Sequence, residues 1–76
     1  MNTFDTIRQM ISDKKGIDIN EIKLETTLEE LDIDSLDMFD VIFEAEEKFD
    51  VTVPNKDLVI KDIQGVVNLI ETLRKP

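Results

Sequence analysis

The side chain with the clearest chemical potential is that of Ser35, which lies in the run Glu30-Leu31-Asp32-Ile33-Asp34-Ser35-Leu36-Asp37-Met38. Asp34 is a favourable helix N-cap, and Asp37, three positions later, can complete a capping box with it. Ser35 is then the first helical residue, with its hydroxyl beside unpaired backbone N–H groups at the positive end of the helix dipole. Such a position favours a phosphate group. Taken alone, the pattern also fits a serine that is itself the cap, or an inert surface serine.

The composition argues against an enzyme and against a metal site. The chain has 76 residues and no His, Cys, Tyr or Trp, so the usual base at neutral pH, the thiolate nucleophile and the usual metal ligands are missing. Carboxylates alone need a sheltering cleft that separates their pKa values, and a chain of this size buries too little surface to build a deep one. We therefore predict no catalytic residues and no metal ligands.

A calcium loop is the one metal motif that needs separate consideration. Asp32-Ile33-Asp34 begins as an EF-hand loop does. Position five of that loop is Leu36, however, position six is Asp37 instead of glycine, and position twelve is Phe43 instead of a bidentate glutamate. An EF-hand is excluded.

The negative charge is concentrated in one segment of the chain. The formal net charge is −9, and residues 25–50 contain eleven acidic residues and a single base, Lys48, whereas the rest of the chain holds seven acids and eight bases. Such a field disfavours nucleic acid, whose phosphates carry the same sign, and favours a basic protein partner. The simpler alternative is a self-repelling surface that keeps the chain in solution.

Hydrophobic periodicity predicts an all-α fold. The expected elements are a helix from about Thr3 to Lys15 that ends at Gly16, a second from about Ser35 to Phe49, a short third capped by Asn55 and including Leu58 to Ile60, and a fourth capped by Asp62 with Leu73 on its apolar face. This is a small four-helix bundle, three main helices plus one short helix, in a single domain over residues 1–76. No signal peptide and no membrane span are expected.

A long connection separates the first two predicted helices. Residues 17–34 carry an apolar residue every two to four positions, so this loop must fold onto the core. Thr27-Leu28-Glu29-Glu30 fits a capping box for a short helical turn. Loops of this length in a compact domain are often functional.

At about 100° per residue, the side chains of the second predicted helix fall into three sets. The buried stripe consists of Met38, Val41, Ile42, Ala45 and Phe49. The apolar residues on roughly the opposite side are Leu36, Phe39 and Phe43, and the acids between the two sets are Asp37, Asp40, Glu44 and Glu47. Because unpaired buried carboxylates are costly, we predict an exposed apolar patch edged by acids, as in a protein-docking site, and not a helix buried on all sides.

The segments around Ser35 resemble those of the acyl carrier proteins. The resemblance rests on Asp34-Ser35-Leu36-Asp37, on an acidic amphipathic helix ending in Glu46-Glu47-Lys48-Phe49, and on the Val53-Pro54 that follows. The Asp-Ser-Leu tripeptide is a weak signal alone, but together with these segments and the length it is specific, and the match covers nearly the whole chain. In that family a dedicated transferase attaches 4′-phosphopantetheine to this serine, and the thiol of the arm carries acyl chains as thioesters.

The resemblance implies a carrier without catalytic activity, in which coenzyme A donates a covalent 4′-phosphopantetheine arm to Ser35. It implies a cytoplasmic monomer that delivers acyl intermediates of fatty-acid, related acyl or polyketide biosynthesis to enzymes with basic docking patches. The residues predicted to bind those partners are Asp34, Leu36, Asp37, Phe39, Asp40, Phe43, Glu44 and Glu47. A peptidyl or aminoacyl carrier is an alternative with the same mechanism, and an unmodified acidic protein-interaction module is the alternative from another class.

Two positions leave questions open. Many members of the family have Gly where Asp32 stands, but Asp adopts unusual backbone angles more readily than most residues, so we expect the turn before Ser35 to form. The difference leaves open whether the carrier serves general fatty-acid synthesis or a dedicated pathway. Ala45, the small member of the buried stripe, either leaves room for an acyl chain or lets a neighbouring helix approach closely.

Overall fold

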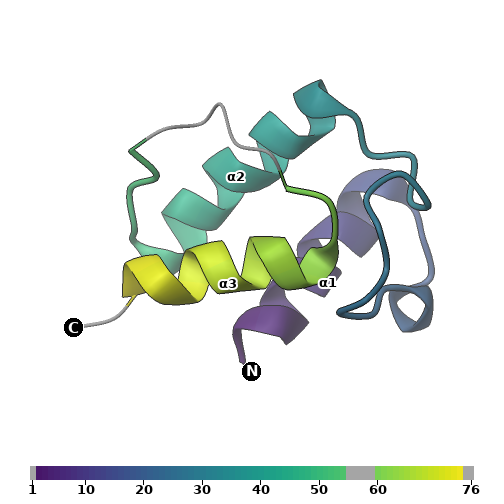
Figure 1. Ribbon diagram of the computed structural model, residues 1–76, viewed down its shortest axis with the longest axis horizontal. Helices are drawn as coiled ribbons and strands as arrows, with labels where there is room; N and C mark the ends of the chain where they lie inside the picture. The colour runs from purple at the N-terminus through teal and green to yellow at the C-terminus, as the bar shows by residue number, and fades with distance from the viewer. Residues whose placement is uncertain (1, 55–59, 75–76) are drawn as a thin grey trace.

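Three α-helices and one short 3₁₀-helix form the regular structure of the computed structural model, which describes residues 2–54 and 60–74 (Figure 1). They are α1 (Thr3–Lys15), η1 (Ile19–Glu21), α2 (Ser35–Phe49) and α3 (Ile63–Arg74). No strand occurs within the described ranges, and the all-α prediction and the bounds of the first two helices are confirmed. The short helix predicted from Asn55 to Ile60 falls on residues 55–59, outside the described residues, except for Ile60, which is described and is not helical.

The helix ends follow the predicted chemistry. Asn2 caps α1, because its side chain accepts a backbone hydrogen bond from the first turn at 2.8 Å. Gly16 ends the same helix with φ 69°, in the left-handed region that favours glycine. At the start of α3, the Asp62 carboxylate accepts a hydrogen bond of 2.8 Å from the backbone N–H of Gly65. These caps fix where each helix begins and ends.

All three helices and the loop between α1 and α2 contribute to one hydrophobic core. Its fully buried members from the helices include Ile7, Ile11, Ile42, Ile63 and Ile70. The loop adds Ile22, Leu28, Leu31 and Ile33, all buried, which confirms that residues 17–34 fold down onto the core. Each helix also contacts the other two, so that α2, which begins with Ser35, is held along its inner side.

The loop is fixed to the segment before α3 by backbone hydrogen bonds. Leu28 N–H donates to the Lys61 carbonyl at 2.9 Å, and Ile63 N–H donates to the Thr26 carbonyl at 3.0 Å. The predicted capping box is present, since Thr27 N–H donates to Glu30 Oε1 at 2.9 Å and Glu30 N–H donates to Thr27 Oγ1 at 3.1 Å. It closes a turn, however, and no helix forms there. The loop therefore has a defined path up to α2 (Figure 1).

Phe49, predicted as a core residue, packs against the core but is only partly buried. The Arg74 guanidinium lies 4.8 Å from the centroid of its ring. Arg74 Nη1 also donates a hydrogen bond of 2.8 Å to Thr3 Oγ1. A cation on an aromatic face is a favourable contact, and here it joins the ends of α2 and α3 to the start of α1.

Candidate functional site

Ser35 is the first residue of α2 and is exposed. The cap of this helix is Asp34, whose Oδ1 accepts a hydrogen bond of 2.9 Å from Asp37 N–H. The interpretation in which Ser35 is itself the cap is therefore wrong. Among the residues that the structure describes, none forms a hydrogen bond with the Ser35 hydroxyl. This oxygen lies at a helix N-terminus, where backbone N–H groups and the dipole favour a negative charge.

Ser12, the only other serine in the sequence, is in a different environment. It is partly buried near the end of α1. Its hydroxyl donates a hydrogen bond of 2.6 Å to the Ile17 carbonyl. Ser12 therefore has a structural task, and of the two serines only Ser35 offers an exposed hydroxyl at a helix N-terminus.

The turn that delivers the chain to Ser35 depends on Asp32. This residue has φ 57°, in the left-handed region that favours glycine, and the turn that we expected to form with Asp at this position is present. Ile33 N–H then turns back to donate to the Leu28 carbonyl at 2.9 Å. The left-handed residue reverses the chain, and Ile33 enters the core one residue before the cap of α2.

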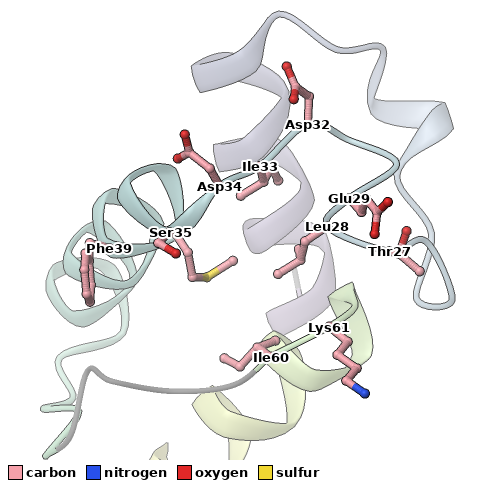
Figure 2. A pocket seen from close by; sticks show the side chains of 11 residues that line it. Thr27, Leu28, Glu29, Asp32, Ile33, Asp34, Ser35, Phe39, Ile60 and Lys61 are labelled. Carbon is pink, nitrogen blue, oxygen red and sulfur yellow. The ribbon is translucent and has the colours of Figure 1, made fainter.

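An open groove of about 990 Å³ lies beside Ser35. Its lining residues are Thr27, Leu28, Glu29, Asp32, Ile33, Asp34, Ser35, Met38, Phe39, Ile60 and Lys61. Figure 2 shows Ser35 and Phe39 on the α2 side of the groove and Leu28 and Ile60 on the side of the loop and of the segment before α3. The sequence did not predict this meeting of Leu28 and Ile60, because it depends on the pairing of two segments far apart in the chain.

Ala45 does not belong to this groove. Its side chain is fully buried, and it is absent from the groove's lining. The groove beside Ser35 is therefore formed without the spare volume that the sequence suggested at Ala45.

The outer side of α2 exposes apolar side chains. Leu36 is 73% exposed, Phe43 54% and Phe39 37%. Met38, Val41, Ile42 and Ala45 face the core, as predicted. The alternative in which α2 is buried on all sides is wrong. We call the surface formed by Leu36, Phe39, Phe43, Asp40 and Glu47 the outer face of α2.

Four of the five acids of α2 fall into two pairs, a division that the sequence did not predict. The fifth, Glu46, accepts a hydrogen bond of 2.7 Å from Val53 N–H. Asp40 and Glu47 are exposed, and neither forms an ion pair with another described residue. Asp37 and Glu44 are partly exposed and each meets a lysine from the end of α1. Lys15 Nζ lies 3.0 Å from Asp37 Oδ2, and Lys14 Nζ lies 3.9 Å from Glu44 Oε1. We call Asp37 and Glu44 with their lysines the α1 edge of α2.

The contact between Lys15 and Asp37 shifts both titrations. The Lys15 hydrogen bond is the main cause that holds the pKa of Asp37 below its ordinary range, and the Asp34 backbone lowers it further. The same hydrogen bond is the main cause that raises the pKa of Lys15, and the nearby carboxylates of Asp32 and Asp34 add to the rise. In the sequence, Lys14 and Lys15 indicate only the end of the first predicted helix, where cations suit the helix dipole. The signal that was missed is their place at the end of α1, opposite the first turn of α2.

In the described ranges, no group of three or more acidic or other metal-ligating side chains is arranged so that it could hold a metal ion. None of the described helices combines the length and the apolar character needed to cross a membrane.

Comparisons with known proteins converge on one family. The family model described as the phosphopantetheine attachment site matches residues 5–73. An acyl carrier protein of Campylobacter jejuni subsp. doylei is 40% identical over 78 aligned positions, which cover 99% of this chain and 100% of that protein. An acyl carrier protein of Streptococcus thermophilus is 42% identical over 75% of this chain and 77% of its own length. One of Lactococcus lactis subsp. cremoris is 38% identical over 93% of this chain and 96% of its own length.

Proposed function

The chain belongs to the acyl carrier proteins that bear phosphopantetheine, and from this premise we propose that Ser35 is the residue that receives the 4′-phosphopantetheine arm. As a carrier protein it is acted on by enzymes and is not a catalyst itself. The observation that supports the choice of Ser35 is its exposed hydroxyl at the first position of α2, to which no described residue is hydrogen-bonded. We further propose that residues 1–76 act as one carrier domain.

The residues around Ser35 fit such an arm. Asp34 caps α2 with its side chain, so the N–H groups of the first turn are ordered next to a phosphate on Ser35. The groove beside Ser35 has apolar walls from Leu28, Ile33 and Ile60, which suits the apolar chain of a bound acyl group. The arm itself, donated by coenzyme A, supplies the thiol on which acyl groups are carried as thioesters.

We propose that partner enzymes dock on α2 next to Ser35. The residues of this proposal are Asp34, Leu36, Asp37, Phe39, Asp40, Phe43, Glu44 and Glu47. The exposure of Leu36 and Phe43 beside acidic side chains supports it, because docking sites combine an apolar centre with a polar rim. The partners are a phosphopantetheinyl transferase and acyl-processing enzymes of fatty-acid or related biosynthesis that present basic patches. The carrier acts as a cytoplasmic monomer and binds no nucleic acid.

The test is the intact mass of the protein after incubation with coenzyme A and a broad-specificity phosphopantetheinyl transferase. We expect one added arm on the wild type and on Ser12→Ala, and none on Ser35→Ala. An arm on Ser35→Ala would place the attachment elsewhere. An unchanged wild-type mass with an active transferase would favour an unmodified acidic interaction module.

A further inference from the structure

The last residue of α1 places a positive charge against the first turn of α2. Lys15 Nζ lies 3.0 Å from Asp37 Oδ2, and the two side chains are only 23% and 29% exposed. Asp37 is two residues from Ser35. A partner that docks over Ser35 therefore meets a carboxylate that is already paired with a cation of the same chain.

A second lysine extends this arrangement along α2. Lys14 Nζ lies 3.9 Å from Glu44 Oε1, and Glu44 is two helical turns beyond Asp37, on the same edge of the helix. Asp40 and Glu47 lie on the neighbouring strip of α2 and are exposed. They form no ion pair with any residue in the described ranges. The acids of these two pairs thus differ in how available they are to a partner.

We propose that Lys15, with Lys14 beside it, is a specificity-determining residue of the docking surface: its ammonium competes with the cations of a partner for Asp37. This proposal rests on the docking surface proposed above. The consequence is that the α1 edge attracts basic partners weakly, while Asp40 and Glu47 on the outer face attract them strongly. Partners whose basic groups bind the outer face are therefore selected over partners whose basic groups bind the α1 edge.

The competition follows from tethering and from charge. Lys15 is part of the same chain, so its local concentration near Asp37 is high and a partner's cation must displace it. Lys15 also repels the basic patch of a partner that approaches from the side of α1. A contact of this exposure is modest in strength, and we expect its removal to change affinity by about two- to fivefold.

Lys15→Gln tests the proposal through the rate at which a phosphopantetheinyl transferase loads the carrier from coenzyme A. At low ionic strength we expect the KM for the carrier to fall about two- to fivefold, with kcat unchanged. The difference should shrink as salt is added, because screening weakens exposed charges. Lys23→Gln is the matched control: it removes the same charge from an exposed loop residue that forms no ion pair with another described residue, and its KM should change less.

Asp37→Asn in both backgrounds separates competition from a structural role of Lys15. We expect Asp37→Asn to raise KM more in Lys15→Gln than in the wild type, because Asp37 is more available to the transferase when Lys15 is absent. Equal effects in the two backgrounds, or an unchanged or higher KM in a folded Lys15→Gln, would overturn the proposal. If Lys15→Gln loses helical content, Lys15→Met, which keeps the aliphatic stem, replaces it.

An error in the proposed role of Ser35 would give a different experimental result. If the wild type gains no arm, the proposed role of Ser35 fails. If the wild type is loaded normally and only the KM pattern of the lysine variants is absent, the role of Ser35 stands and the competition by Lys15 is rejected.

Discussion

The Asp34 carboxylate accepts a hydrogen bond of 2.9 Å from the backbone N–H of Asp37, and this contact brackets Ser35 within the first turn of α2. The side chain of Asp34 is exposed, so its contribution comes from the cap and not from burial. The cap orders the backbone on both sides of Ser35. The position of the Ser35 hydroxyl therefore depends on a residue that does not itself react.

Replacing the cap should destabilise α2 at its start. We expect Asp34→Ala to lower the free energy of unfolding by about 1 kcal/mol, the usual cost of a lost N-cap. Asp34→Ser keeps a capping oxygen and should lower the free energy of unfolding by only about a few tenths of a kcal/mol. Urea unfolding followed by circular dichroism measures both. Equal losses in the two variants would show that the cap hydrogen bond does not stabilise α2.

The contact between Lys15 and Asp37 should make stability depend on pH. The pKa of Asp37 is lowered, mainly by Lys15, so the ionised carboxylate stabilises the fold above its ordinary pKa and this contribution is lost as pH falls through the lowered value. The pKa of Lys15 is raised, mainly by Asp37, so its contribution is complete below the ordinary lysine pKa and is lost as pH rises through the raised value. Both contributions are therefore present at neutral pH.

Urea unfolding of the wild type and of Asp37→Asn at a series of pH values measures this dependence. We expect the wild type to be more stable at neutral pH and the difference to shrink toward zero in acid, where Asp37 is protonated. A difference that stays constant down to strongly acidic pH would contradict the origin that we give for it.

The left-handed backbone at Asp32 gives a further prediction about stability. A residue other than glycine in this region costs roughly 1–2 kcal/mol, with Asp and Asn tolerated best. Since Asp32 has φ 57°, we expect Asp32→Gly to be at least as stable as the wild type. Asp32→Val should be less stable than the wild type by about 1–2 kcal/mol. Thermal unfolding of the three proteins tests the order, and a valine variant as stable as the glycine variant would contradict it.

The sequence was sufficient to predict the elements that depend on local chemistry. The caps at Asp34 and Asp62, the end of α1 at Gly16 and the inner stripe of α2 apart from Phe49 each follow from neighbouring residues. The family resemblance also pointed to the unusual backbone at Asp32 before the structure placed it at a positive φ.

Contacts between distant segments could not be predicted in this way. The groove beside Ser35 requires the pairing of Leu28 with Lys61, and no local pattern specifies that pairing. The division of the α2 acids depends on the end of α1 lying against α2. Phe49 shows the same limit, because helical periodicity places it inside, whereas it lies at the edge of the core under Arg74.

The exposed acids of α2 should control the rate at which partners associate. We expect Asp40→Lys/Glu47→Lys to slow loading by a phosphopantetheinyl transferase severalfold, because rim charges act mainly on association rates. The effect should weaken with salt. Timed loading assays over a range of ionic strength measure this rate.

The control for this double reversal changes the net charge by the same amount at two residues outside α2. Glu25 and Glu71 are both exposed, so Glu25→Lys/Glu71→Lys carries the same net charge with the outer face intact. We expect this control to be loaded nearly as fast as the wild type. If both double variants are slowed to the same extent, the total charge of the carrier, and not the placement of Asp40 and Glu47, sets the rate.

The last prediction concerns the three phenylalanines of α2. Phe43 is 54% exposed and Phe39 37%, and both lie on the outer side of the helix. An aromatic anchor at the centre of a docking site can supply ~2 kcal/mol or more. We therefore expect Phe43→Ala to reduce kcat/KM for transfer to a cognate acyl-processing enzyme by roughly tenfold or more, with a loss of stability below about 1 kcal/mol.

Phe39 and Phe49 provide the comparison. Phe39 also lines the groove beside Ser35, so Phe39→Ala should impair transfer and cost more stability than Phe43→Ala does. Phe49 packs against the core and under the Arg74 guanidinium, so Phe49→Ala should cost about 2 kcal/mol of stability while the transfer rate of the folded fraction stays near that of the wild type. Unfolding curves and transfer kinetics on the same samples separate the two effects. If Phe43→Ala unfolds as readily as Phe49→Ala, or transfers normally, then the outer face of α2 does not act as the docking surface, although the role proposed for Ser35 would stand.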